Sequence, residues 1–175
     1  MVTVSPPDTW AYALRLPHDP RAARVARVTV RAALHGHGMD EVLDVVELLT
    51  SELVTNAYRH TEGPASLRLT ALGGGRLRVG VWDTSSHVPP PFDEPPGGHV
   101  PSVPVDAGGG RGLVLVRECA DSWGGWSLAE GPLDRGVGKL LWFEVGGPRR
   151  GTTETDGPER YDPLRGDDRA ASASR

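Results

Sequence analysis

Two polar residues interrupt the apolar face of a segment with strong helical periodicity, residues 40–61. At about 100° per residue, the apolar positions form a stripe centred close to Val45, made of Val42, Val45, Leu48, Leu49 and Leu53. Glu52 and Asn56 fall in the middle of that stripe, and their i, i+4 spacing aims a carboxylate and an amide at one point. Because an unpaired buried carboxylate costs several kcal/mol, the two groups either face a cavity or are satisfied by partners. An internal capping network, or a helix whose C-terminal half faces water, would also account for them.

A second candidate is Asp83, which directly follows the alternating strand predicted for residues 76–82. A chain that leaves a sheet at this point can present the carboxylate at the sheet edge. The same sequence, Asp83 followed by Thr84 and Ser85, is also typical of an Asx turn, in which the carboxylate only organises the backbone. Taken alone, the sequence favours the Asx turn over the sheet-edge interpretation.

A third candidate is a glycine-rich run directly before a short apolar helix: Gly108, Gly109, Gly110, Arg111 and Gly112, followed by Leu113. Glycines allow backbone N–H groups to converge on an anion at a helix N-terminus, and Arg111 adds positive charge. The run is not a Walker A loop, because it lacks a Lys followed by Ser or Thr. A flexible hinge is the competing interpretation.

The elements that must position these groups follow from periodicity and turn residues. A first helix is indicated by Val25, Val28, Thr29 and Ala32 at helical spacing, and the glycines at 73–75 predict a hairpin between two alternating strands. The predicted order is strand 10–16, helix 19–36, helix 40–61, strands 66–72 and 76–82, helix 112–121, and strands 122–130 and 137–145. This order predicts a two-layer α/β (α+β) sandwich, in which a mixed, mostly antiparallel sheet carries helices on one face.

Glycine and proline are unusually abundant, with 23 Gly and 16 Pro, and many of them lie between Asp83 and Gly112. A loop of that length needs either a function or disorder to explain it, since ordinary connections take about 4 to 6 residues. We expect a flexible leader over residues 1–9 and one domain over residues 10–146. Residues 147–175 read as a disordered polar tail, in which only Tyr161 and Leu164 are large and apolar.

Charge and cysteine content exclude several classes of function. There are 19 Lys and Arg against 23 Asp and Glu, a net charge of −4 with no basic run, which argues against direct binding to nucleic acid or an anionic membrane. The single cysteine, Cys119, rules out an internal disulfide and fits a reducing compartment. No apolar stretch approaches the roughly 20 residues of a membrane span, and the first residues lack the apolar block of a signal peptide. We therefore expect a cytoplasmic protein.

Taken together, the three candidate motifs resemble a known set. Glu52-Leu-Val-Thr-Asn-Ala57, Val81-Trp-Asp83 and Gly108-Gly-Gly-Arg-Gly-Leu113 are similar, in order and spacing, to the N, G1 and G2 boxes of the histidine kinase-like ATPase superfamily, which has the Bergerat fold. The nearest branch is the bacterial anti-sigma factor/serine-protein kinases, which residues 52–60 and 138–144 both resemble. The resemblance covers about residues 14–145 and leaves out the tail.

The resemblance implies a role for each motif. Asn56 would offer its side-chain oxygen to Mg²⁺ bridging the phosphates of ATP, and Glu52 would be the general base that takes a proton from a serine hydroxyl or a water. Asp83 would accept a hydrogen bond from the adenine amino group. Gly108, Gly109, Gly110, Arg111, Gly112 and Leu113 would surround the phosphates, and residues 84–109 would form a mobile lid over the nucleotide.

The function implied is an ATP- and Mg²⁺-binding anti-sigma factor with serine-protein kinase activity. Its partners would be a sigma factor, an anti-anti-sigma protein, or both, and dimers are usual in this family.

Two departures motivate an alternative, a non-catalytic module whose affinity for a partner protein is set by nucleotide. Asp83 is followed by Thr-Ser-Ser-His where the superfamily has Asp-x-Gly-x-Gly, and Leu140 stands where a Thr near the adenine is frequent. A weaker alternative is the detached ATPase domain of a sensor kinase.

Overall fold

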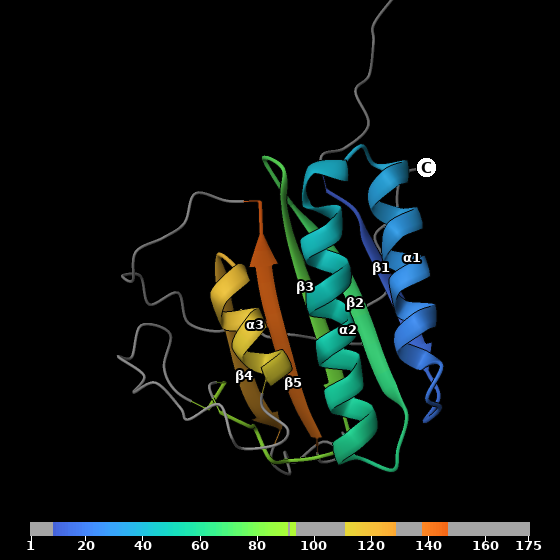
Figure 1. Ribbon diagram of the computed structural model, residues 1–175, viewed down its shortest axis with the longest axis vertical. Helices are drawn as coiled ribbons and strands as arrows, with labels where there is room; N and C mark the ends of the chain where they lie inside the picture. Colours follow the sequence, from blue (N-terminus) through green and yellow to red (C-terminus); the bar gives the residue numbers. More distant parts are fainter. Residues whose placement is uncertain (1–8, 91, 94–110, 129–137, 147–175) are drawn as a thin grey trace, which may run out of the picture.

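The computed structural model describes residues 9–90, 92–93, 111–128 and 138–146. In these residues a five-stranded antiparallel sheet carries helices on one face (Figure 1), which confirms the predicted α+β sandwich. The elements are β1 (Ala11–Leu16), α1 (Ala22–Gly36), a 3-10 turn (Asp40–Val42), α2 (Leu43–His60), β2 (Ala65–Gly73), β3 (Arg76–Asp83), α3 (Arg111–Cys119), β4 (Ser122–Leu128) and β5 (Gly138–Val145). All of the described strand pairs are antiparallel.

The predicted hairpin is present between β2 and β3. Gly73, Gly74 and Gly75 all have positive φ (80°, 61° and 74°), a conformation that L side chains rarely adopt, so glycine at these positions is what lets the chain reverse here. The register then runs from Gly73 opposite Arg76 to Ser66 opposite Trp82, with an irregularity near the turn. β3 is thereby fixed in the interior of the sheet, with Asp83 at its end.

The strand order β1-β2-β3-β5-β4 places the last strand between β3 and β4. After β3 the chain passes through α3 and β4 before β5 returns beside β3, with Asp83 opposite Lys139. Asp83, the last residue of β3, is therefore paired with Lys139, the second residue of β5. This pairing decides the surroundings of Asp83.

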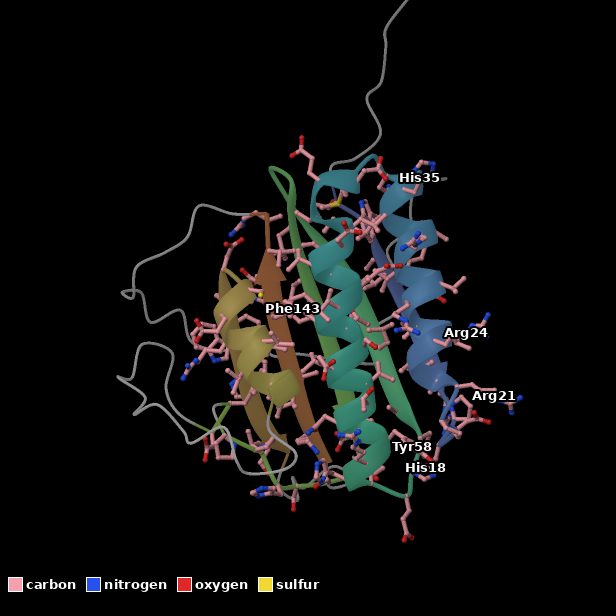
Figure 2. The ribbon with its side chains drawn as sticks, viewed as in Figure 1. His18, Arg21, Arg24, His35, Tyr58 and Phe143 are labelled. Atoms are coloured by element: carbon pink, nitrogen blue, oxygen red, sulfur yellow. The ribbon has the colours of Figure 1, made fainter. Side chains whose placement is uncertain are left out.

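The hydrophobic core lies between the sheet and the helices. α1 buries Ala22, Ala26, Val30 and Leu34, whereas Val25 and Val28 of its predicted pattern are 49% and 62% exposed. In Figure 2, Phe143 of β5 marks this core between α2 and α3. The buried stripe of α1 therefore runs through Ala26 and Val30, on a different face of the helix from Val25 and Val28.

The buried face of α2 also differs from the predicted stripe. The predicted centre at Val45 is wrong: the buried arc lies around Val46 and Leu53, and Leu48 is 42% exposed. α1 lies along one side of α2 (Figure 1), where Arg31 forms an ion pair with Glu47 at 2.6 Å. Because α2 packs against both the sheet and α1, its buried arc is turned toward α1.

The end of α2 is held by an aromatic pair. His18, from the connection between β1 and α1, stacks on Tyr58 with ring centroids 4.7 Å apart, and its Nε2 lies 3.0 Å from the Tyr58 carbonyl oxygen. Figure 2 shows the two side chains together at the end of α2. This contact joins the start of α1 to the last turn of α2.

Candidate nucleotide site

Glu52 of α2 meets Gly112 at the beginning of α3. A Cβ atom built on Gly112 would overlap the Glu52 carboxylate, with Cδ only 2.7 Å away. The half-buried carboxylate therefore lies against the backbone of the first turn of α3 and occupies the space that any side chain at residue 112 would need. Two of the motifs predicted to act together, one on each helix, are in direct contact.

Asn56 lies one helical turn beyond Glu52 and is buried, with 9% of its surface exposed. Its Oδ1 atom finds no hydrogen-bond partner among the described residues. An unsatisfied buried acceptor costs about 1–3 kcal/mol, and native proteins rarely keep one without a reason. An amide oxygen is also the kind of ligand that Mg²⁺ prefers, so the residue present fits the ion that the sequence resemblance implies.

Asp83 is buried, and both of its carboxylate oxygens have partners. Lys139 Nζ lies 2.9 Å from Asp83 Oδ1 and 2.8 Å from Oδ2, and the Ser85 backbone N–H donates to Oδ1 at 2.9 Å. Both side chains of this ion pair are about 1–2% exposed. The Asx-turn interpretation of Asp83 is thus correct, and the same carboxylate also balances a buried ammonium group.

Lys139 is the residue near the site that the sequence analysis missed. It precedes Leu140 and Leu141 in an apolar run, and strand alternation places it on the same face as Leu141 and Phe143, toward the helices. A lysine in register with buried positions is the signal that could have identified it. A buried ammonium needs a carboxylate partner, and Asp83 across the strand pair is that partner.

The remaining predicted site residues are placed as follows. Arg111 is the first residue of α3, and Leu113 is buried in the core, where it anchors that helix. Gly108, Gly109 and Gly110 lie outside the described residues, as does most of the predicted lid.

The described beginning of the predicted lid is packed onto the sheet. Phe92 is 1% exposed, and both Val88 and Phe92 lie close enough to Gly125 of β4 that a Cβ there would be within 3.0 Å of them. The prediction that the lid starts at Thr84 is therefore wrong, because residues 84–93 include a core anchor.

A sequence model of the histidine kinase-like ATPase domain matches residues 16–130. The chain belongs to this family. The match includes the Glu52 and Asn56 helix, Asp83 and the start of α3.

A relative from Streptomyces coelicolor, an uncharacterized protein, is 40% identical over 77 residues. The alignment covers 42% of this chain and 66% of the relative, just under two thirds of its length. Membership of the histidine kinase-like ATPase family implies a nucleotide-binding, regulatory domain. Among the described residues, the structure has no helix with the length and apolar character needed to span a bilayer.

Proposed function

We propose that this protein binds ATP with Mg²⁺ between α2 and the start of α3 and acts as a cytoplasmic anti-sigma factor with serine-protein kinase activity toward an anti-anti-sigma partner. The observation that supports this most strongly is the junction of Glu52, Asn56 and Gly112. It brings a carboxylate, an unsatisfied amide oxygen and a close-approach glycine to one helix junction. The family supports ATP binding, and the finer activity rests on the sequence resemblance.

Each residue would have a distinct task. Asn56 Oδ1 would be a ligand of Mg²⁺, which when bound neutralises charge on the phosphates. Glu52 would accept the proton of the substrate serine hydroxyl as its oxygen bonds to the γ-phosphorus and the bond from that phosphorus to the departing ADP oxygen breaks. The backbone at the start of α3 would contribute N–H groups to the phosphates.

Asp83 would face the adenine end of the site together with Lys139. The carboxylate already accepts hydrogen bonds from Lys139 and Ser85, and the lone pair left on Oδ2 would take the adenine amino group. This engagement, together with the missing glycines after Asp83, favours the second candidate, a non-catalytic module in which nucleotide only sets the affinity for a partner protein.

Titration calorimetry and phosphate transfer separate these functions. The full chain is titrated with ATP in the presence and absence of Mg²⁺, and labelled ATP is then supplied with a candidate anti-anti-sigma protein. The kinase proposal expects binding and transfer, and expects Glu52→Gln to lower the transfer rate by at least about 100-fold with little change in ATP affinity.

Asp44→Asn is the matched control, because Asp44 is an exposed carboxylate on the same helix. Equal transfer by wild type and Glu52→Gln would contradict the role of Glu52. ATP binding without turnover or transfer would favour the non-catalytic module. Transfer of phosphate to a histidine of a separate protein would favour a detached sensor-kinase domain. Absence of ATP binding would refute all three.

A further inference from the structure

The face of the sheet turned away from the helices carries three tryptophans. The described helices all cover one face (Figure 1), and strand alternation directs Trp82, Trp126 and Trp142 to the other, around Leu140. The register aligns Trp82, Leu140 and Trp126 across three neighbouring strands. We call these four residues the tryptophan face.

Glycines allow the indoles to lie flat on the sheet. Trp142 is flanked across the ladder by Gly80 and Gly124, and a Cβ on Gly124 would lie 2.8 Å from the Trp142 ring. Trp126 and Trp142 stack with centroids 5.6 Å apart and 23° between the ring planes. Each of the three indoles is only partly buried. The result is a broad aromatic platform, with nothing among the described residues layered on it as the helices are on the other face.

The charge around this platform is mainly positive. The strand positions on this face include four arginines and one glutamate: Arg15, Arg68, Arg76, Arg78 and Glu144. The Arg78 guanidinium lies 4.8 Å from the Trp142 ring centroid and donates to Glu144 at 2.7 Å. The platform therefore suits an acidic segment with apolar anchors. A second copy would bring two arginine-rich faces together, which like-charge repulsion disfavours.

One segment of this chain has the matching composition. Residues 154–168 contain six acidic residues against two arginines, and they include Tyr161 and Leu164, the large apolar residues of the chain beyond Gly146. Tyr161 and Leu164 are three positions apart. The segment thus combines an aromatic and an aliphatic anchor with a net negative charge, the complement of the tryptophan face.

The covalent connection to β5 favours binding of this segment to the tryptophan face. Trp142 lies near the end of β5, and Tyr161 follows 15 residues beyond Gly146, a span of up to about 50 Å when extended. A tether of this kind gives an effective concentration in roughly the millimolar range.

We propose that residues 154–168 bind the tryptophan face of the same chain, with Tyr161 and Leu164 against the indoles and the acidic side chains near Arg76 and Arg78. The arginines supply charge complementarity, and the indoles supply the apolar contact area. The proposal is independent of the nucleotide chemistry, because it concerns the opposite face of the sheet from Glu52 and Asn56.

Indole N–H resonances of the full chain labelled with ¹⁵N test this binding directly, because the five tryptophans contain their own controls. Trp10 and Trp123 lie away from the tryptophan face, packed against the core on the helix side. In a Tyr161→Ala/Leu164→Ala variant we expect the resonances of Trp82, Trp126 and Trp142 to shift several-fold more than those two. Adding a synthetic peptide of residues 154–168 to the variant should move the three resonances back.

A Thr152→Ala/Thr153→Ala variant, of equal length and altered outside the acidic segment, should leave all five resonances in place. Equal spectra for wild type and the Tyr161/Leu164 variant would overturn the proposal and leave the tryptophan face for another protein. A shift of the three resonances that depends on protein concentration in both forms would also overturn it, because it would assign the face to a second copy.

Discussion

At the scale of single residues, Asn56 combines burial with an unsatisfied oxygen, a combination that costs stability unless a ligand is bound. No described group donates to Asn56 Oδ1. Replacing it with leucine removes the unsatisfied acceptor and keeps similar volume. The two effects of such a change should have opposite signs, one on stability and one on ligand binding.

We expect Asn56→Leu to raise the free energy of unfolding of the ligand-free protein by about 1 kcal/mol, because a buried acceptor no longer lacks a donor. The same variant should lose at least about ten-fold in Mg²⁺-dependent ATP affinity. Urea unfolding and calorimetry measure the two quantities. Thr55→Ala, at the adjacent position, should leave ATP affinity unchanged. A variant with lower stability and intact affinity would show that Oδ1 has a structural partner instead.

The buried pair of Lys139 and Asp83 has a different energetic character. Lys139→Met leaves the Asp83 carboxylate buried without its cation, which should cost about 3–5 kcal/mol in unfolding free energy. Asp83→Asn/Lys139→Met removes both charges and retains an oxygen for the Ser85 N–H, so it should be less destabilised than Lys139→Met. Denaturant unfolding of both single variants and the double variant gives the coupling. Simple additivity would mean that the pair is not coupled in solution.

At the scale of elements, the junction of α2 and α3 depends on one missing side chain. Alanine normally stabilises a helix relative to glycine by up to about 1 kcal/mol, yet at Gly112 its Cβ would overlap Glu52. We expect Gly112→Ala to lower the free energy of unfolding by about 1–3 kcal/mol as the two helices shift apart. The proposed phosphate transfer should fall with it.

Gly36→Ala is the matched control for this substitution. Gly36 ends α1, its φ is not positive, and a Cβ there meets no atom within 4 Å. Gly36→Ala should raise the free energy of unfolding by up to about 1 kcal/mol, because alanine has the higher helix propensity. Thermal or urea unfolding of both variants measures these changes in the free energy of unfolding. A Gly112→Ala variant more stable than wild type would show that α3 can move away from Glu52 without a loss of stability.

The contact between α1 and α2 adds a dependence on pH. Arg31 donates to both oxygens of Glu47 at 2.7 and 2.6 Å, and this hydrogen bonding holds the pKa of Glu47 below its ordinary value. A lowered pKa in the folded state means that the contribution is present above the ordinary pKa of glutamate and is lost as the pH falls through the folded-state pKa. Arg31→Gln should therefore be slightly less stable than wild type at neutral pH and equal to it in strong acid. The measurement is the melting temperature of wild type and of Arg31→Gln from neutral pH to strong acid. A difference that stays constant with pH would show that the Arg31–Glu47 pair contributes nothing.

At the scale of the whole molecule, the order of elements could be predicted because the signals are local. Alternation in β2 and β3 and the glycines between them specify a hairpin without reference to other parts of the chain. The proximity of Glu52 and Asn56 also follows from helical spacing alone. The contact of Glu52 with Gly112 required the family resemblance, since these residues are far apart in the sequence.

The rest depended on neighbours that no local pattern reveals. The buried arc of α2 is turned because α1 lies beside it, and Val28 is exposed because α1 buries the face that carries Ala26 and Val30 instead. Lys139 was overlooked because a lysine in a strand reads as a surface residue until its cross-strand partner is known. Prediction failed where burial is decided by two or three elements at once.

The β2–β3 turn offers a practical use. Figure 1 places it at the end of β3 away from Asp83, and Cβ atoms added at Gly73, Gly74 and Gly75 would meet no atom within 4 Å. Surface turns of this kind tolerate added chain best. A fluorescent label or a short affinity tag grafted between the two strands would report on the protein while leaving α2, α3 and the tryptophan face untouched.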